Sequence, residues 1–348
     1  MQVAEQILFG LTVAFYFASA VLLGVGVAYR RAVFERMSFV VLVVGLVCNT
    51  GAIVLRGILS SRVPLADLPE SLLFLAWCTV ALFLLLNLRY RVAAAGLILV
   101  PLAFFLVAVA AALYETPQPL REQLRGAWLA THVGVSLLAY AGFVVAFATA
   151  FFYVVQEDLL KKRYRQVRRL ILGLVIALGT GIGLYVGYLI ARPTLFEDAT
   201  GHRVYAYSSS DLIVIAVGAL AGLGISIVIG LVAARGAAKP SFANRLPALY
   251  LLDDLSYRSV LFGFGLLALG IITGSVWSHF AWGSWWIWDP KETWALAAWL
   301  FYAVYLGLRS FFDWRGRNAA LLAITGLFLI LFAFLGVKFL VPGKHDFN

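Results

Sequence analysis

The chain has 348 residues, of which 63% are hydrophobic and only 13% are charged. A soluble domain of this length needs far more polar surface, so the composition excludes a soluble protein and indicates a polytopic membrane protein. The formal net charge of +10 is then expected in basic loops that set the membrane orientation, and no nucleic-acid partner is expected.

Apolar runs of roughly 17 or more residues are long enough to cross a lipid bilayer. The first run has the length of a full span and lacks a basic segment before it, so we expect no cleavable signal peptide. We predict an all-α polytopic membrane protein of about ten transmembrane helices, with residues 1–348 forming one helical bundle. In chain order the runs cover about residues 5–29, 38–59, 70–88, 92–114, 127–155, 170–191, 211–234, 259–278, 293–309 and 319–341.

Basic residues decide the direction in which the chain crosses the membrane. With the N-terminus outside, 18 of the 27 Lys and Arg residues lie on the inner side, seven lie outside, and Arg56 and Lys338 lie within helices near their outer ends. The positive-inside rule therefore predicts that both termini are on the outer, periplasmic side. The inner basic residues are Arg30, Arg31, Arg36, Arg89, Arg91, Lys161, Lys162, Arg163, Arg165, Arg168, Arg169, Arg235, Lys239, Arg245, Arg258, Arg309, Arg315 and Arg317.

A tryptophan-rich connection, residues 279–293, is predicted on the outer side. Five of the ten tryptophans fall within "WGSWWIWDPKETW" at Trp282–Trp294, among an Asp, a Lys and a Glu. An interfacial aromatic belt is the plain alternative, but a belt distributes its indoles over many helix ends. Pro290 is expected to open the next helix with Asp289 as its N-cap, which makes the connection a rigid, Trp-lined platform for a ligand.

All four histidines lie at or just below the outer face on this topology: His132, His202, His279 and His345. Imidazole is a common ligand for metals and for haem iron, although a single histidine at a membrane interface is more often a hydrogen-bonded surface residue. A flat macrocycle needs aromatic and apolar walls together with one or two axial nitrogens. Histidines beside a tryptophan-rich loop are typical of such a site.

The segment "WGSWWIWDPKETWAL" resembles the WWD signature of the haem-handling membrane proteins of c-type cytochrome maturation, and most closely the CcsA (ResC-like) family of cytochrome c synthase subunits. Further similarity lies in "LDDLSYRSVLFGFGLLALGIITGSVW" at 252–277, "ESLLFLAW" at 70–77, "THVGVSLLAY" at 131–140 and the end "FLGVKFLVPGKHDFN". The tryptophan signature is specific, and the other segments support it.

The resemblance implies a haem lyase subunit that binds haem b at the outer face and presents it for thioether attachment to the Cys-x-x-Cys-His motif of apocytochrome c. It also implies a CcsB-type membrane partner and a place in the bacterial cytoplasmic membrane with a periplasmic active face. By position, His132 and His345 are the expected axial ligands of the haem iron. Trp282, Trp285, Trp286 and Trp288 are expected to wall the ring, and Asp289 and His279 are further candidates for the site.

Several positions depart from the family pattern or extend it. The family commonly has a membrane-embedded histidine where this chain has Gly307, and the stretch 171–235, which includes His202, is expected to add two helices to the family core. Haem propionates are anionic and call for a nearby cation, for which Arg56 and Lys338 are candidates. The plain alternative is that both side chains extend to the membrane interface and bind no ligand, as Arg and Lys near helix ends commonly do.

Two other functions remain open from the sequence. The chain is alternatively a haem exporter or chaperone without ligase activity, because the tryptophan signature also occurs in haem-delivery proteins. The other alternative is a non-haem membrane enzyme whose tryptophans are only interfacial.

Overall fold

A computed structural model describes residues 1–114, 127–191, 194–197, 203–206, 209–237 and 239–336. Eight helices within these segments are long and apolar enough to cross a membrane. The predicted all-α membrane fold is therefore confirmed, and the described segments add to it two strands of four residues each. The chain divides into two compact units, one of Met1–Val154 with Leu246–Asn348 and the other of Val155–Arg245.

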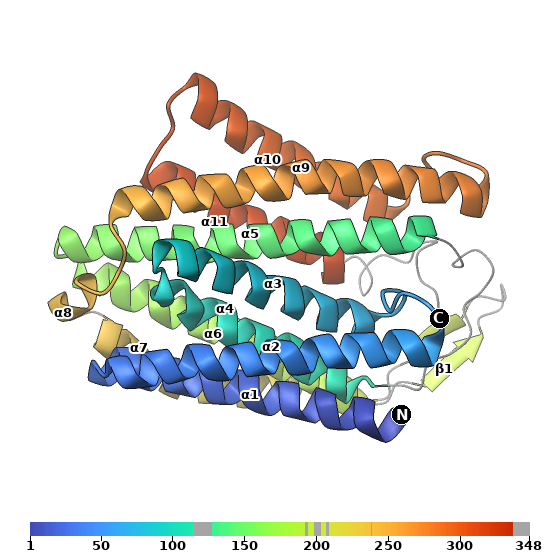
Figure 1. Ribbon diagram of the computed structural model, residues 1–348, viewed down its shortest axis with the longest axis horizontal. Helices are drawn as coiled ribbons and strands as arrows, with labels where there is room; N and C mark the ends of the chain where they lie inside the picture. Colours follow the sequence, from blue (N-terminus) through green and yellow to red (C-terminus); the bar gives the residue numbers. More distant parts are fainter. Residues whose placement is uncertain (115–126, 192–193, 198–202, 207–208, 238, 337–348) are drawn as a thin grey trace. The chain divides into compact units, whose positions relative to one another are not determined.

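The first part of the larger unit is built from helices α1 to α4 (Figure 1). They span Gln2–Tyr29 (α1), Ala32–Ser60 (α2), Leu68–Tyr90 (α3) and Gly96–Ala112 (α4), with a 3-10 turn at Ala93–Ala95 before α4. Helix α1 packs against α2 and α4, and α3 packs against α2 and α4. Tight turns join these helices, so neighbours along the chain are also neighbours in space.

The second part of this unit contains α5 (Ala127–Leu160, whose last residues belong to the smaller unit), α9 (Leu249–Trp282), α10 (Pro290–Phe311) and α11 (Arg317–Leu331), followed by a π-helical turn at Phe332–Gly336. The middle of α5 is enclosed, since Ala139, Phe143 and Ala146 have no exposed surface. Helix α9 begins at Leu249, ten residues before the apolar run predicted at 259. These added residues include the buried Leu252 and Leu255, and Asp253 among them accepts two hydrogen bonds from the Arg309 guanidinium, at 2.9 and 2.5 Å.

The smaller unit is a pair of long helices with a short hairpin between them. Helix α6 (Tyr164–Ala191) packs along α7 (Ser209–Ala237), and strands β1 (Thr194–Glu197) and β2 (Arg203–Ala206) pair antiparallel with Thr194 opposite Ala206. A one-turn helix, α8 (Pro240–Ala243), follows α7. The predicted spans 170–191 and 211–234 fall on α6 and α7. The total of ten spans, and the assignment of 171–235 as an addition to the family core, stay predictions.

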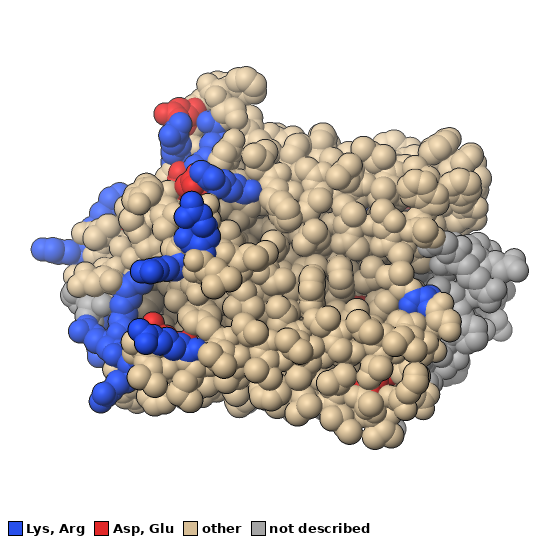
Figure 2. All heavy atoms as spheres, viewed as in Figure 1, with Lys and Arg blue, Asp and Glu red and all other residues tan. Residues whose placement is uncertain are grey.

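Basic side chains mark one end of the larger unit. Figure 2 shows Lys and Arg gathered over the end where α1 turns into α2, a turn that contains Arg30 and Arg31. Arg89 and Arg91 lie in the last turn and at the C-cap of α3. This is the distribution that the positive-inside rule assigns to a cytoplasmic face. The orientation itself stays a prediction.

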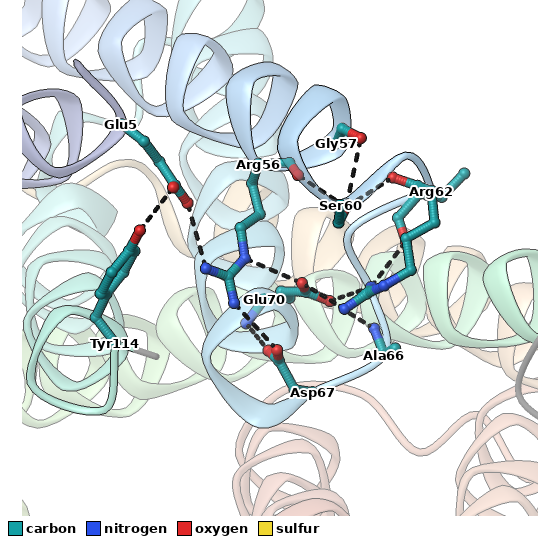
Figure 3. A network of polar contacts seen from close by, with 10 residues as sticks. Glu5, Arg56, Gly57, Ser60, Arg62, Ala66, Asp67, Glu70 and Tyr114 are labelled. Carbon is teal, nitrogen blue, oxygen red and sulfur yellow. Dashed lines mark hydrogen bonds and ion pairs between the residues drawn. The ribbon is translucent and has the colours of Figure 1, made fainter. Parts of the chain in front are cut away.

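A buried ion cluster occupies the other end of α1 and α2 (Figure 3). Arg56 is 2% exposed and pairs with three carboxylates: Glu70 at 3.1 Å, Asp67 at 3.3 Å and Glu5 at 3.5 Å. Arg62 pairs with Glu70 at 2.7 Å, and the Tyr114 hydroxyl donates to Glu5 at 2.7 Å. The cluster thus links α1, α2, α3 and Tyr114, which lies two residues after α4.

The same cluster begins helix α3. The Asp67 carboxylate accepts the backbone N–H of Glu70 at 2.8 Å as the N-cap, and Glu70 accepts the backbone N–H of Ala66 at 2.8 Å. Burial raises the pKa of the Asp67 carboxyl, and the Glu70 carboxylate raises it further against the opposing effect of the two guanidinium groups. Burial and the contact with Glu5 raise the pKa of Tyr114 to about 12, so its hydroxyl remains a donor at neutral pH.

Arg56→Met is expected to destabilise the protein by about 3–5 kcal/mol, because it leaves the buried Glu5 and Glu70 carboxylates without their shared cation. Arg56→Lys keeps the charge and is expected to lose less. Arg258→Met is the matched control, because Arg258 forms an exposed pair with Asp254 that is worth about 0–1 kcal/mol. Thermal unfolding of the purified protein in detergent measures the difference. Equal midpoints for Arg56→Met and Arg258→Met would contradict a structural role of the cluster.

The orientation is tested by cysteine labelling. In Val63→Cys the new thiol lies in the α2–α3 connection, where Val63 is 57% exposed, and in Arg315→Cys it lies in the α10–α11 connection, where the Arg315 side chain is 71% exposed. A membrane-impermeant maleimide is expected to label the first variant in intact cells and the second only after the membrane is opened. The unsubstituted protein, whose Cys78 is buried and Cys48 half-buried, sets the background. The reverse pattern would invert the topology.

Candidate functional site

His132 lies one turn into α5 and faces α9. Its Nδ1 is 2.7 Å from the carbonyl oxygen of Gly270. A carbonyl oxygen only accepts, so Nδ1 donates, and the lone pair of the neutral ring is on Nε2. Histidines that bind metals usually have this arrangement, in which one ring nitrogen is fixed by a backbone carbonyl and the other is the ligand.

Small residues on α9 make room for this imidazole. A Cβ at Gly274 would lie 2.7 Å from both Cε1 and Nδ1 of His132, and a Cβ at Gly270 would lie 2.5 Å from the hydroxyl of Ser136. Further along the same two helices, an added Cβ at Gly142 would lie 3.4 Å from the Cα of Gly263. A row of small residues allows two membrane helices to approach closely. The row therefore sets both the distance between α5 and α9 and the position of His132.

Trp277 continues this face of α9 and forms the wall beside His132. The two rings are nearly parallel, with centroids 6.5 Å apart and planes at 8°. Trp277 also contacts Trp282 edge to face, with ring centroids 4.7 Å apart. Leu129 and Trp277 are both buried, and Ala66, Val133, Ala281 and Trp282 pack against them. His132 and one tryptophan of the signature thus share a single aromatic cluster.

Hydrogen bonds to the backbone hold the tryptophan-rich loop in one shape. Helix α9 ends at Gly283, whose φ of 73° is the left-handed conformation that glycine adopts readily. Asp289 caps α10 by accepting the N–H of Lys291 at 3.0 Å, and Glu292 accepts the N–H of Ile287 at 3.0 Å. Ser278 donates to the carbonyl of Ser284 at 2.8 Å. The acidic residues of the signature thus shape the loop, as expected for Asp289 as the N-cap.

The remaining tryptophans of the loop point to different places. Trp288 has a φ of 56°, which is unusual for a bulky residue, and its side chain is 70% exposed. Trp286 contacts Trp288 edge to face at 5.8 Å. Trp285 is 57% exposed and stacks on His279 with ring centroids 4.4 Å apart and planes at 6°. The loop therefore contains a packed tryptophan, Trp282, and two exposed ones.

The structure brings only some of the predicted site residues together. His132 and Trp282 both contact Trp277, whereas His279 and Trp285 form a separate pair. Arg56, a candidate for the propionates, is already held by three carboxylates. His345, His202 and Lys338 lie outside the described residues. Within the described part of the chain no group of three His, Cys, Asp or Glu residues is placed to hold a metal ion.

Sequence reasoning did not single out Trp277, Gly270 and Gly274 as site residues. The spacing of 270, 274 and 277 places them on one face of a helix, with small residues four apart. That spacing is the signal that was available. The spacing does not identify the residue that packs against this face, because the sequence does not show that His132 of α5 lies opposite α9.

Comparisons with known proteins agree with the sequence signature. A family model described as Cytochrome C assembly protein matches residues 65–345. The chain is 30% identical to a cytochrome c biogenesis protein CcsA of Prochlorococcus marinus, over 97% of this chain and 93% of the relative. It is 34% identical to proteins of the same name from Gloeothece citriformis, over 86% of this chain and 84% of the relative, and from Crocosphaera subtropica, over 82% and 79%.

Gly274→Ala is expected to destabilise the protein by about 1–3 kcal/mol, because the new methyl group would overlap the His132 ring. Gly265→Ala is the matched control, since it lies on the same helix with no atom within 4 Å of the added Cβ. Replacement of a helical glycine by alanine at that position is expected to be neutral or to stabilise by up to about 1 kcal/mol. Thermal unfolding of the two variants in detergent compares them. A Gly274→Ala midpoint at or above that of Gly265→Ala would contradict the packing of His132.

Proposed function

Because the chain belongs to the cytochrome c assembly family as a CcsA-type cytochrome c biogenesis protein, we propose that it binds haem b at the outer membrane face and presents it for covalent attachment to apocytochrome c. The family handles haem, and the chain is an integral membrane protein.

His132 is the proposed ligand to the haem iron within the described part of the chain. Its Nδ1 is engaged by the Gly270 carbonyl, which directs the Nε2 lone pair to the iron and keeps the ring from turning. Trp277 lies parallel to the imidazole and Trp282 packs against Trp277, so an apolar wall stands next to the ligand nitrogen. The arrangement leaves Nε2 as the candidate axial nitrogen on this side. His345 is the proposed second ligand.

The loop between α9 and α10 is the proposed lid over the ring. Its exposed indoles, Trp285 and Trp288, offer flat apolar surface, and its shape is maintained by Asp289 and Glu292 rather than by contact with lipid. A pre-formed loop avoids an ordering cost when ligand binds. Trp282, Trp285, Trp286 and Trp288 stay the proposed aromatic residues of the site, and the proposed role of Asp289 is to hold the loop.

The reaction needs no nucleophile from this chain. Each cysteine thiol of the acceptor adds its S–H bond across one vinyl C=C bond of haem, so a C–S and a C–H bond form without net oxidation or reduction. The work of the protein is to position the vinyl edge and to fill the axial positions of the iron. The acceptor's own histidine then replaces one of the two protein ligands. A CcsB-type membrane subunit is the proposed partner, in the bacterial cytoplasmic membrane with a periplasmic active face.

The fixed imidazole of His132 beside Trp277 carries this proposal, and its variant tests it. Protein purified after expression with excess haem is expected to show a Soret band with a six-coordinate spectrum. His132→Ala is expected to lose most of the bound haem or to shift the band, and added imidazole is expected to restore it in part. Thr131→Ala, an exposed neighbour, is the control. Unchanged haem content and spectrum in His132→Ala would remove His132 as a ligand.

Ligation is separated from delivery by co-expression with a Cys-x-x-Cys-His acceptor and the partner subunit. We expect a covalent haem product on the acceptor that survives denaturing electrophoresis, and a loss of at least about tenfold with His132→Ala. Bound haem without a thioether product would identify a delivery protein instead. The absence of a Soret band in the purified wild-type protein would contradict haem binding altogether.

A further inference from the structure

A haem carried between membrane and acceptor has two propionate carboxylates, and each needs hydrogen-bond donors where it leaves water. Arg56, the arginine within the outer ends of the helices, does not supply them. Its guanidinium is buried among Glu5, Asp67 and Glu70, so an approaching carboxylate would meet three negative charges. The donors must therefore come from elsewhere at the site. This question rests on the proposed function and concerns the same site.

Two nitrogens in the tryptophan-rich turn are buried and have no hydrogen-bond partner among the described residues: Nδ1 of His279 and Nε1 of Trp286. An indole N–H only donates, and an imidazole donates from Nδ1 when that nitrogen carries the proton. Both residues are half-buried as a whole, so each ring also reaches the surface. Buried polar atoms without partners are rare in proteins and ask for an explanation, of which a ligand is one.

The position of His279 on α9 argues against a role as the axial partner of His132. His132 contacts α9 at Gly270, Gly274 and Trp277. His279 is two residues beyond Trp277, which is about 200° around the helix. It consequently leaves α9 on the side away from His132, where its ring stacks on Trp285. The imidazoles of His132 and His279 are therefore not placed to bind one iron from opposite faces. The edge of the macrocycle extends well beyond its iron, so His279 is a candidate to contact that edge.

Neighbouring contacts hold the His279 ring and the backbone of Trp286 in place. The parallel stack with Trp285 holds the plane of the His279 ring, and the backbone carbonyl of His279 accepts the N–H of Gly283 at 2.9 Å. Ser284 donates to the carbonyl of Trp286 at 3.0 Å. Donors that are held before binding serve a carboxylate better than mobile side chains.

We propose that His279 Nδ1 and Trp286 Nε1 are the donors that receive the propionate carboxylates of haem. His279 is then a positioning residue that orients the ring about the iron, so that the vinyl edge is turned to the acceptor. The pair distinguishes a carboxylate from its ester. It adds no bond to iron.

The test compares haem with haem dimethyl ester, which has the same ring, iron and vinyl groups but no carboxylate. Both are titrated by absorption into the purified full-length chain in detergent. His279→Leu and Trp286→Phe are each expected to weaken haem binding about tenfold, the loss of one charge-assisted hydrogen bond. Both are expected to weaken the binding of the ester by much less, because an ester carbonyl accepts only a weaker, neutral hydrogen bond. His279→Asn, which restores a donor, is expected to recover most of the affinity, and the position of the Soret band is expected to stay the same in all variants.

Leu269→Ala is the control, because Leu269 lies on the same helix and is 51% exposed. Equal losses for haem and its ester, or a shifted Soret band, would overturn the assignment and give His279 a packing or iron-binding role. A carboxylate-dependent loss in Lys291→Gln alone would also overturn it, by moving the role to that lysine. If the wild-type chain binds haem and all variants bind it equally, only this assignment fails. If the wild-type chain binds neither ligand, the proposed function fails as well.

Discussion

The close contact between α5 and α9 is the constraint on which the candidate site depends. Gly270 and Gly274 leave room for His132, and the Gly270 carbonyl holds its Nδ1 at 2.7 Å. An imidazole at this depth would otherwise turn between rotamers. Trp277, one turn further on, then lies flat beside the imidazole.

The ion cluster of Arg56 connects this contact to the N-terminal helices. Glu70 holds the backbone of Ala66, and Ala66 packs against the pair of Leu129 and Trp277. Unpaired charges are costly in a membrane, so the charged groups of this cluster must stay close enough to remain paired. Its effect at the site is indirect: it fixes the α2–α3 connection and thereby one side of the tryptophan cluster. The same pairing removes Arg56 as a binding group for anions.

The gathering of five tryptophans around three charged residues at Trp282–Trp294 has a partly structural explanation. Asp289 and Glu292 accept hydrogen bonds from backbone N–H groups, and these bonds hold the shape of the loop that contains the exposed tryptophans. A belt at the interface needs no such bonds. In the proposed function the shaped loop covers haem, the exposed indoles contact its faces, and the nitrogens of His279 and Trp286 meet its acidic edge.

Hydrophobic run lengths alone predicted the helices of the larger unit, because a helix must satisfy its own backbone in lipid. The Asp289 cap and the tryptophan signature were also readable from local spacing. The start of α9 was not, since its first turns contain charged residues, and Asp253 among them pairs with the distant Arg309. Likewise, the sequence determined that His132 lies near the start of its helix, while the tertiary structure decided that it faces Gly270 and Trp277 and that His279 does not. Periodicity places a residue on a face of its own helix, but which helix covers that face depends on packing between distant segments.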